Sequence, residues 1–294
     1  MRSVRTILAI CMQNIRKWNK DYRVWSIAVL VLIMIKIYIN DFHDLCGKLH
    51  SDMPIWIFPF IYSQYYMKVI FTIPLLLLFC NAPFIDNNQI YVYIRSGKTR
   101  WLLGQLTYIF VSSAIYYLFI ALSTFVLMSL SNASYSLEWG KVLKTIAEVD
   151  MSGLGNYPFI QVSDMVVRCF TPIQAVIFTF LVSWCNAILI GIVIFTFNYL
   201  FRNKYLGVTI ASFGIVFSFF VEIAGYPNLI NYSPTSWITL DKIDIGGRTA
   251  YPSFYYCMIV YWAIIAVLVA SVFVFGRKRK LIVGGNSYGS IYIC

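Results

Sequence analysis

Few residues in this chain combine the types and the spacing that chemistry requires. The tripeptide Gly97-Lys98-Thr99 is similar to the end of a phosphate-binding loop. The leading glycine of that motif would fall at Val92, however, and no buried strand precedes it. We therefore expect no nucleotide site in this chain and no enzymatic activity of its own.

Cysteine and histidine show no metal or redox pattern. The seven Cys residues lack CxxC spacing, and several lie inside apolar runs, where a free Cys behaves as a small apolar residue. Cys46 and Cys169 both fall in segments expected near the outer surface. The sequence therefore permits a disulfide between them but does not decide whether it forms. His43 and His50 flank Cys46 without further ligands at a recognisable spacing. We expect no metal and no other cofactor.

The composition indicates a protein that crosses a membrane several times. The chain has 294 residues, of which 60% are hydrophobic and 12% charged, and its mean hydropathy is +0.73. A soluble domain carries about twice that charge and does not sustain repeated apolar runs of about 18 residues or more. The net charge of +11 would suit nucleic acid if the cations lined one face of a soluble fold. Here they lie in short loops at helix ends, and we expect no nucleic-acid partner.

Six apolar segments have the length of membrane-spanning helices. We expect one all-α transmembrane domain over residues 1–294, with Thr171 capping the fourth span and Pro172 in its first turn. The expected spans are 24–40, 55–80, 101–130, 171–201, 205–224 and 254–275.

The positive charges predict the orientation of these spans. Lys and Arg concentrate in 2–23, 95–100, 202–204 and 277–280, whereas the remaining loops hold Lys48, Lys141, Lys144, Arg168, Lys242 and Arg248. Because cytoplasmic loops carry the excess of Lys and Arg, both termini are predicted to be cytoplasmic.

An amphipathic helix is predicted before the first span, over residues 3–20. Its apolar stripe lies opposite Arg5, Arg16 and Lys17, a pattern typical of a helix that lies in the membrane interface. The stripe consists of Val4, Ile7, Leu8, Cys11, Ile15 and Trp18. Simple anchoring of the chain to lipid is one interpretation of this helix.

A few polar residues interrupt the spans. Lys68 would lie roughly 10 to 20 Å below the outer interface, at about 1.5 Å per residue, where an ammonium costs about 2.5 to 3.5 kcal/mol unless it faces protein or water. Together with Gln64, Tyr65 and Asn186 it is a candidate for lining a transport pathway; the alternative is that the span starts late and Lys68 reaches the interface. Glu222 is expected to reach water at the outer end of the fifth span rather than to pair with Lys68.

The most informative polar interruption on the cytoplasmic side is 83–100. It alternates Ile90, Val92 and Ile94 with Tyr91 and Tyr93, which predicts a short amphipathic element. Asp86 is a possible N-cap, Ser96-Gly97 ends the element, and Thr99 is placed to cap the next helix. A loop that merely anchors two spans by its positive charge is one interpretation.

Between two spans, however, the run Tyr93 to Gly104 resembles the segment after the second span of type-2 ATP-binding-cassette (ABC-2) transport permeases. The chain departs from that family at Asp86-Asn87-Asn88, where a Glu followed by a Gly is expected. The piece Asn231 to Trp237 also resembles an outer segment that dips back into the membrane in these permeases. The resemblance implies that 83–100 packs on an ATPase subunit, bordered by the helix over 3–20. The implied docking residues are Ile90, Tyr91, Tyr93, Ile94, Arg95, Lys98 and Arg100.

The resemblance further implies the membrane subunit of a bacterial ABC exporter in the cytoplasmic membrane. Two permease subunits, identical or paralogous, would enclose the pathway, and two separate ATPase subunits would hydrolyse ATP. The substrate is expected to be hydrophobic or amphipathic: a peptide, a lipid or a drug-like compound, with an antimicrobial peptide favoured by the kind of small permease that the chain resembles.

Two other classes of function compete with a permease. A secondary transporter or channel without an ATPase partner tends to show internal repeats or paired broken helices, and this sequence has no convincing repeat. A membrane-embedded enzyme would need acids, His or Cys clustered on the spans, and two His and a lone Glu222 do not supply them.

Overall fold

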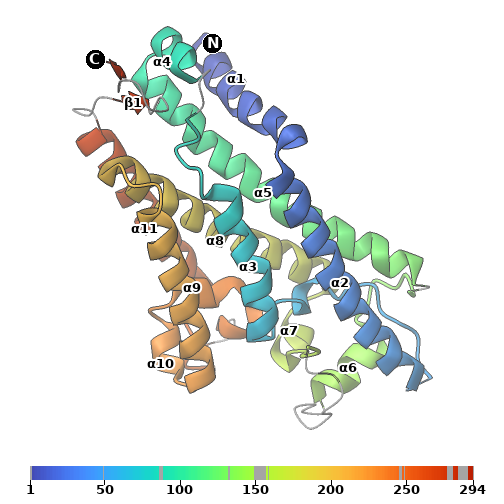
Figure 1. Cartoon of the computed structure of the whole chain (residues 1–294). Helices are drawn as coiled ribbons and strands as arrows, with labels where there is room; N and C mark the ends of the chain where they lie inside the picture. The colour runs from blue at the N-terminus through green and yellow to red at the C-terminus, as the bar shows by residue number, and fades with distance from the viewer. Residues whose placement is uncertain are drawn as a thin grey trace.

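The computed structural model describes residues 2–48, 50–85, 89–131, 133–148, 157, 159–244, 247, 249–276, 281–283 and 291–293. These residues form a helical membrane protein in which five helices are long and apolar enough to cross a bilayer. The five are α2 (Tyr22–Lys48), α5 (Lys98–Leu130), α8 (Pro172–Phe201), α9 (Leu206–Ala224) and α11 (Phe254–Gly276). They run roughly lengthwise through the molecule, and the shorter α3 (Tyr65–Phe79) lies among them (Figure 1).

The first span is longer than the expected 24–40. Helix α2 continues through the segment predicted to be an outer loop and ends only at Lys48. Phe42, Leu45 and Cys46 are buried in that extension, and Asp44 pairs with Lys48 one turn later, at 3.2 Å. The extension is helical because its buried side chains keep the helical spacing of a packed face.

The expected second span, 55–80, is only half helical. A 3₁₀ turn, η2 (Phe58–Phe60), and further turns occupy the first part, and the α-helix begins at Tyr65. Helix α3 therefore has 15 residues, a length of about 22 Å at 1.5 Å per residue. The non-helical part is not exposed, because Ile57, Phe60, Ile61 and Tyr62 are fully buried. The chain thus packs irregular backbone inside protein, which is where a membrane protein tolerates it.

Helix α8 is the centre of the bundle. It packs against α3, α5, α9 and α11, and two thirds of its most apolar stretch are buried by other helices. Thr171 caps it, and the Gln174 side chain accepts a hydrogen bond from the Thr171 backbone, 3.1 Å away, to complete a capping box. The cap predicted at Thr171 and the first-turn Pro172 are thereby confirmed.

Shorter elements close both ends of the bundle. At one end lie α1 (Arg2–Arg16), η1 (Lys17–Lys20), α4 (Gln89–Ser96) and a short antiparallel pair, β1 (Leu281–Val283) with β2 (Ile291–Ile293) (Figure 1). At the other end lie α6 (Gly140–Glu148), α7 (Asp164–Cys169) and α10 (Pro227–Ile230). Next to α10, η4 (Pro234–Ile238) and η5 (Leu240–Lys242) fold back onto the helices, and η4 packs on α8, α9 and α11.

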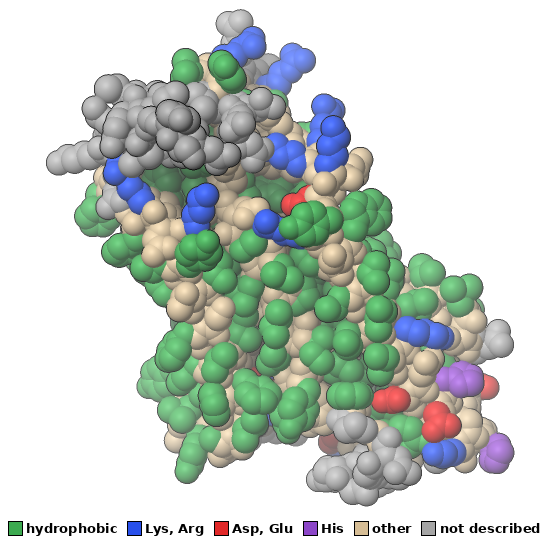
Figure 2. Space-filling view, in the orientation of Figure 1, with side chains coloured by type: hydrophobic (Ala, Val, Ile, Leu, Met, Phe, Trp, Pro, Cys, Tyr) green, Lys and Arg blue, Asp and Glu red, His purple; other side chains and the backbone are tan. Residues whose placement is uncertain are grey.

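Charge separates between the two ends. Most of the Lys and Arg side chains in view gather around the end with α1 and α4, whereas the His side chains and most of the Asp and Glu lie at the other (Figure 2). We call these the basic end and the acidic end. The basic end holds Arg5, Arg16, Arg95, Lys98, Arg100, Arg202 and Lys204.

Candidate functional site

The predicted docking element folds as a helix at the basic end. Helix α4 begins at Gln89 and ends at Ser96, as the Ser96-Gly97 signal predicts. Gly97 then adopts φ of 81°, a left-handed value that favours glycine, and α5 starts at Lys98. Gly97 therefore occupies the capping position of α5 that was predicted for Thr99. The predicted cap Asp86 lies outside the described residues.

The predicted docking residues divide into an exposed set and a buried one. Tyr91 is 75% exposed and Ile94 64% exposed, and Arg95 and Arg100 are exposed beside them. We call these four residues the α4 face. Arg95 lies on α4 and Arg100 in the first turn of α5. An exposed Tyr and Ile flanked by two arginines is typical of a protein-binding surface.

Tyr93 points the other way, into the protein. Its ring lies 5.8 Å from that of Trp101 in an edge-on arrangement, and burial raises the pKa of its hydroxyl. Tyr93 is therefore a packing residue that holds α4 on α5, and its expected place on the docking surface is corrected. Lys98 is half-buried at the start of α5. The side chain of Ile90 is outside the described set.

A closed ring of side-chain hydrogen bonds connects α1, α4 and α5. Trp101 Nε1 donates to Gln89 Oε1 at 2.8 Å, and Gln89 Nε2 donates to Asn14 Oδ1 at 3.1 Å. Asn14 Nδ2 donates to Gln105 Oε1 at 2.9 Å, and Gln105 Nε2 returns to Gln89 Oε1 at 3.5 Å. We call these four residues the amide cluster. All four are buried, so the cluster holds the three helices in one fixed arrangement.

Close helix packing reinforces this arrangement. Gly104 of α5 lies directly under Ile10 of α1, and a Cβ at position 104 would sit 2.7 Å from the Ile10 Cβ. Farther along, Trp18 Nε1 donates a 2.8 Å hydrogen bond to Tyr108 Oη. Helix α1 therefore lies along the first turns of α5, while Val4, Leu8 and Met12 of its apolar side remain exposed.

A groove opens between α1 and α4. It has a volume of about 520 Å³, and its lining includes Thr6, Gln13, Val92, Arg95 and Arg100. Because Arg95 and Arg100 belong to both the α4 face and this groove, the α4 face and α1 form one continuous surface. This geometry agrees with the expected position of the N-terminal helix beside the docking element.

A second cluster lies at the acidic end and involves charge. Lys68 Nζ lies 2.5 Å from Glu222 Oε1, and both side chains are only 4% exposed. Lys68 also donates to the Ser236 carbonyl at 3.2 Å, and Ser218 Oγ donates to Glu222 Oε1 at 3.3 Å. The expectation that Glu222 reaches water and stays apart from Lys68 is therefore wrong. We call Lys68, Glu222, Ser218 and Ser236 the ion-pair cluster.

The late start of α3 explains this pairing. Since the helix begins at Tyr65, Lys68 lies in its first turn rather than several turns inside a longer span. Glu222 lies in the last turn of α9, which packs on α3. The start of α3 and the end of α9 therefore meet beneath η4, although the expected span boundaries placed Lys68 and Glu222 at different depths in the membrane.

The four residues proposed to line a pathway do not converge on one cavity. Gln64 is the half-exposed residue before α3, and Tyr65 packs on Tyr66 and Phe219, with ring centroids at 4.2 and 5.6 Å. Lys68 belongs to the ion-pair cluster. Asn186 is fully buried near the middle of α8, beside Tyr117, and neither atom of its amide makes a well-formed hydrogen bond.

Three residues of the amide cluster were not singled out as a site from the sequence. Asn14 belongs to the polar side of an amphipathic helix, and Gln105 resembles the small polar residues that line close helix contacts. Gln89 is the first residue of an element whose alternating pattern does not show which of its faces is buried. No local pattern in the sequence indicates the shared cluster, because Asn14 is 75 residues from Gln89 and 91 from Gln105.

The cysteines in the described part of the chain are all free thiols. Cys46 is buried, Cys169 is exposed, and both thiols are free. Among the described residues, no group of three or more His, Cys, Asp and Glu is placed to hold a metal ion. The Gly97-Lys98-Thr99 run follows helix α4 rather than a strand, which differs from the context of a phosphate-binding loop.

No protein-family model, curated protein or solved structure matches this chain.

Proposed function

We propose that this protein is the membrane subunit of an ABC transporter and that a separate ATPase docks on the α4 face. The observation that carries the proposal is an exposed Tyr91, Ile94 and Arg95 on α4, with Arg100 exposed at the start of α5, where buried hydrogen bonds fix α4 to α1 and α5. A docking helix that transmits force has to move its neighbours with it. The amide cluster supplies that rigid connection.

The charge distribution supports a cytoplasmic position for this face. The basic end carries α1, α4 and the turn between α8 and α9, and its excess of Lys and Arg supports a cytoplasmic position. With this orientation the ATPase and its ATP are on the same side as α4. The membrane is the bacterial cytoplasmic membrane.

In the proposed mechanism, α1, α4 and the first turns of α5 act as one lever. Two ATPase subunits bind ATP and close, and each pulls the α4 face of one permease subunit. The second permease subunit is a copy of this chain or a paralogue. Motion of α5 then changes its packing on α8, and access to the pathway between the subunits alternates.

The lipid-facing surface supports a hydrophobic or amphipathic exported substrate. An open groove of about 360 Å³ between α3 and α9 is lined by Val69, Ile73, Val216 and Phe219, among others. Tyr65 and Tyr66 pack against Phe219 at one end of it. Aromatic rings above an aliphatic groove suit a peptide, a lipid or a drug-like compound with one polar end.

Co-purification in mild detergent tests the proposal. We expect an ATPase with an intact phosphate-binding loop to purify with the wild-type chain, and to be lost from an Ile94→Glu variant and from an Arg95→Glu/Arg100→Glu variant. Leu137→Glu and Lys141→Glu change equally exposed residues at the acidic end and serve as controls. An ATPase that stays bound to the α4-face variants would contradict the docking role.

A secondary transporter is the second candidate, and the ion-pair cluster is the observation that favours it. Ionisable side chains buried in a membrane protein often mark an ion or proton route. If no ATPase purifies with an intact oligomer, Lys68 and Glu222 are the residues to test for substrate-coupled ion movement.

A further inference from the structure

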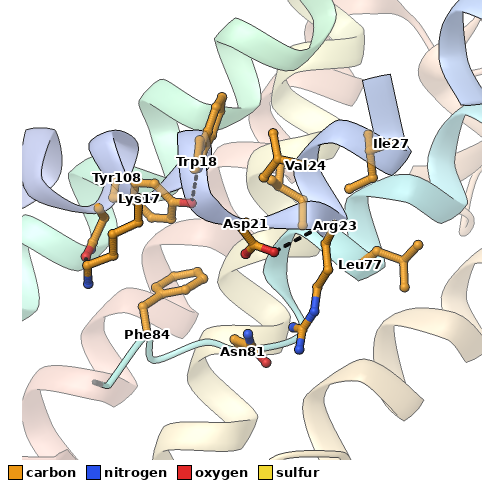
Figure 3. A pocket seen from close by; sticks show the side chains of 12 residues that line it. Lys17, Trp18, Asp21, Arg23, Val24, Ile27, Leu77, Asn81, Phe84 and Tyr108 are labelled. Carbon is orange, nitrogen blue, oxygen red and sulfur yellow. Dashed lines mark hydrogen bonds between the residues drawn. The ribbon is translucent and has the colours of Figure 1, made fainter. Parts of the chain in front are cut away.

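A small pocket lies where the N-terminal helix gives way to the first span. It is formed by the end of α1, η1, the start of α2, the chain after α3 and Tyr108 of α5. Its volume is about 90 Å³, which is room for several water molecules and so for one phosphate group. Figure 3 shows its side chains, with Arg23 extending towards Asn81 and Lys17 on the other side of Asp21.

We propose that this pocket binds the headgroup phosphate of an anionic glycerophospholipid, with Arg23 and Lys17 as the cationic contacts. This inference does not depend on the ATPase partner. It rests on the charge of the lining, on the weak partners of Arg23 and on the aliphatic residues on the other side of the pocket.

The guanidinium of Arg23 has donors to spare. It donates to Cys80 Sγ at 3.4 Å and forms a hydrogen bond with the Tyr22 side chain. Both partners are uncharged and therefore weak, and they leave part of a group with five N–H donors unused. Guanidinium groups bind phosphate through two parallel hydrogen bonds. The Asn81 amide lines the same pocket and can donate to a further oxygen.

The charge of the lining favours a single negative charge. Lys17 and Arg23 are offset by the one carboxylate of Asp21, which leaves a net charge of +1. The Asp21 Oδ1 already accepts the Arg23 backbone N–H at 3.0 Å, and Lys17 Nζ donates to Asn14 Oδ1 at 3.1 Å. A phosphodiester with one negative charge matches this lining better than a dianion or a zwitterionic headgroup.

The apolar side of the pocket indicates a lipid rather than free phosphate. Val24 and Ile27 of α2 and Leu77 of α3 line it, in the direction in which both helices enter the apolar part of the bundle. At the start of α2, Tyr22 is 72% exposed and Trp25 is 60% exposed. Exposed aromatic rings at a helix end mark the membrane–water interface, so the pocket is level with lipid headgroups.

Thermal unfolding of the full chain in detergent, with added short-chain lipid, tests this proposal. We expect phosphatidylglycerol to raise the midpoint of the wild-type protein, and phosphatidylcholine and inorganic phosphate to leave it unchanged. In a Lys17→Gln/Arg23→Gln variant the apparent affinity for phosphatidylglycerol falls by about fivefold per cation removed. Arg16→Gln/Lys20→Gln removes two exposed cations of the same segment and is the matched control.

A second variant keeps the test decisive if the double change harms folding. Leu77→Glu retains both cations and places a carboxylate where an acyl chain would lie, so it also weakens phosphatidylglycerol binding. Equal loss in the control pair would mean that general surface charge attracts the lipid, and the pocket assignment would fail. A midpoint shift with inorganic phosphate alone, or an unchanged affinity in Leu77→Glu, would overturn the assignment to a lipid.

Discussion

The amide cluster and the ion-pair cluster both hold separate segments of the fold together, but one uses neutral side chains and the other uses charged ones. Each joins two segments that are close in sequence to a third that is distant, one cluster at the basic end and the other at the acidic end. The amide cluster uses neutral donors and acceptors that satisfy one another. The ion-pair cluster buries a full positive and a full negative charge, which must each lose their water.

This difference predicts how the two regions tolerate change. A neutral hydrogen bond contributes about 0.5–1.5 kcal/mol net, and leaving one buried partner unpaired costs about 1–3 kcal/mol. A buried ion pair is sensitive to the loss of one member, because the remaining charge stays uncompensated, but it can tolerate the loss of both. We therefore expect the acidic end to respond more strongly to single substitutions than the basic end.

The largest predicted effect is that of Lys68→Met. It leaves Glu222 buried without its counter-charge and should lower the free energy of unfolding by about 3–5 kcal/mol. The midpoint of thermal unfolding in detergent measures the loss. The double variant Lys68→Met/Glu222→Leu should regain most of it, and a double variant as unstable as the single one would show that Lys68 matters for another reason.

A Gly104→Val substitution should come next. Its side chain would meet Ile10, whose Cβ lies 2.7 Å from the position of the new Cβ, and overpacking of this kind costs about 1–3 kcal/mol. Since α1 is the element that must move, we also expect faster proteolysis near Arg16. Gly214→Val is the control, because nothing lies within 4 Å of a Cβ at that position. Equal stability of the two variants would contradict close packing of α1 on α5.

Loss of one amide should have an effect of comparable size. Gln105→Leu removes the acceptor of Asn14 Nδ2, and an unpaired neutral group costs about 1–3 kcal/mol. A double variant with Asn14→Leu should cost less than the sum of the two single changes, because the cluster acts as a unit. Strict additivity would separate the two residues energetically and argue against a shared cluster.

The last prediction compares the reactivity of two cysteine thiols and needs no substitution, so the fold stays intact. Cys169 is exposed at the acidic end, whereas Cys11 is buried on α1 and burial raises the pKa of its thiol. Because the proposed orientation puts Cys11 on the cytoplasmic side, a membrane-impermeant maleimide added to intact cells at pH 7 should label Cys169 and spare Cys11. Because the thiolate is the reactive form, Cys11 should also react more slowly than Cys169 after the membrane is permeabilised. Labelling of Cys169 only after the membrane is permeabilised would reverse the proposed orientation.

The membrane-spanning helices were largely predictable because hydropathy over long windows carries their signal. The boundaries of 101–130, 171–201, 205–224 and 254–275 agree with α5, α8, α9 and α11 to within three residues. The segments 41–48 and 55–64 were predicted wrongly. The first contains charges but packs Phe42 and Leu45 against the bundle, and the second is apolar but folds into turns.

The two polar clusters could not be read from the sequence for a common reason. Gln105 follows Asn14 by 91 residues and Glu222 follows Lys68 by 154, so only the packing of helices brings them together. Local patterns did predict a short amphipathic element between two spans, whereas the docking residues Tyr91 and Ile94 were implied by the resemblance. The local pattern could not show that the Tyr93 ring is buried. A period of two places Tyr93 on the same face as Tyr91, whereas the 3.6-residue period of a helix places the two rings on different faces.

The most direct test of the docking role is site-specific photo-crosslinking in the membranes of the cell that makes this protein. A photoreactive amino acid replaces Ile94 on the α4 face in one variant and Leu137 at the acidic end in another. We predict that the Ile94 probe crosslinks to an ATPase that carries a phosphate-binding loop and that the Leu137 probe does not. Absence of an ATPase adduct at Ile94, or an equal yield at both positions, would contradict the assignment of α4 as the docking surface.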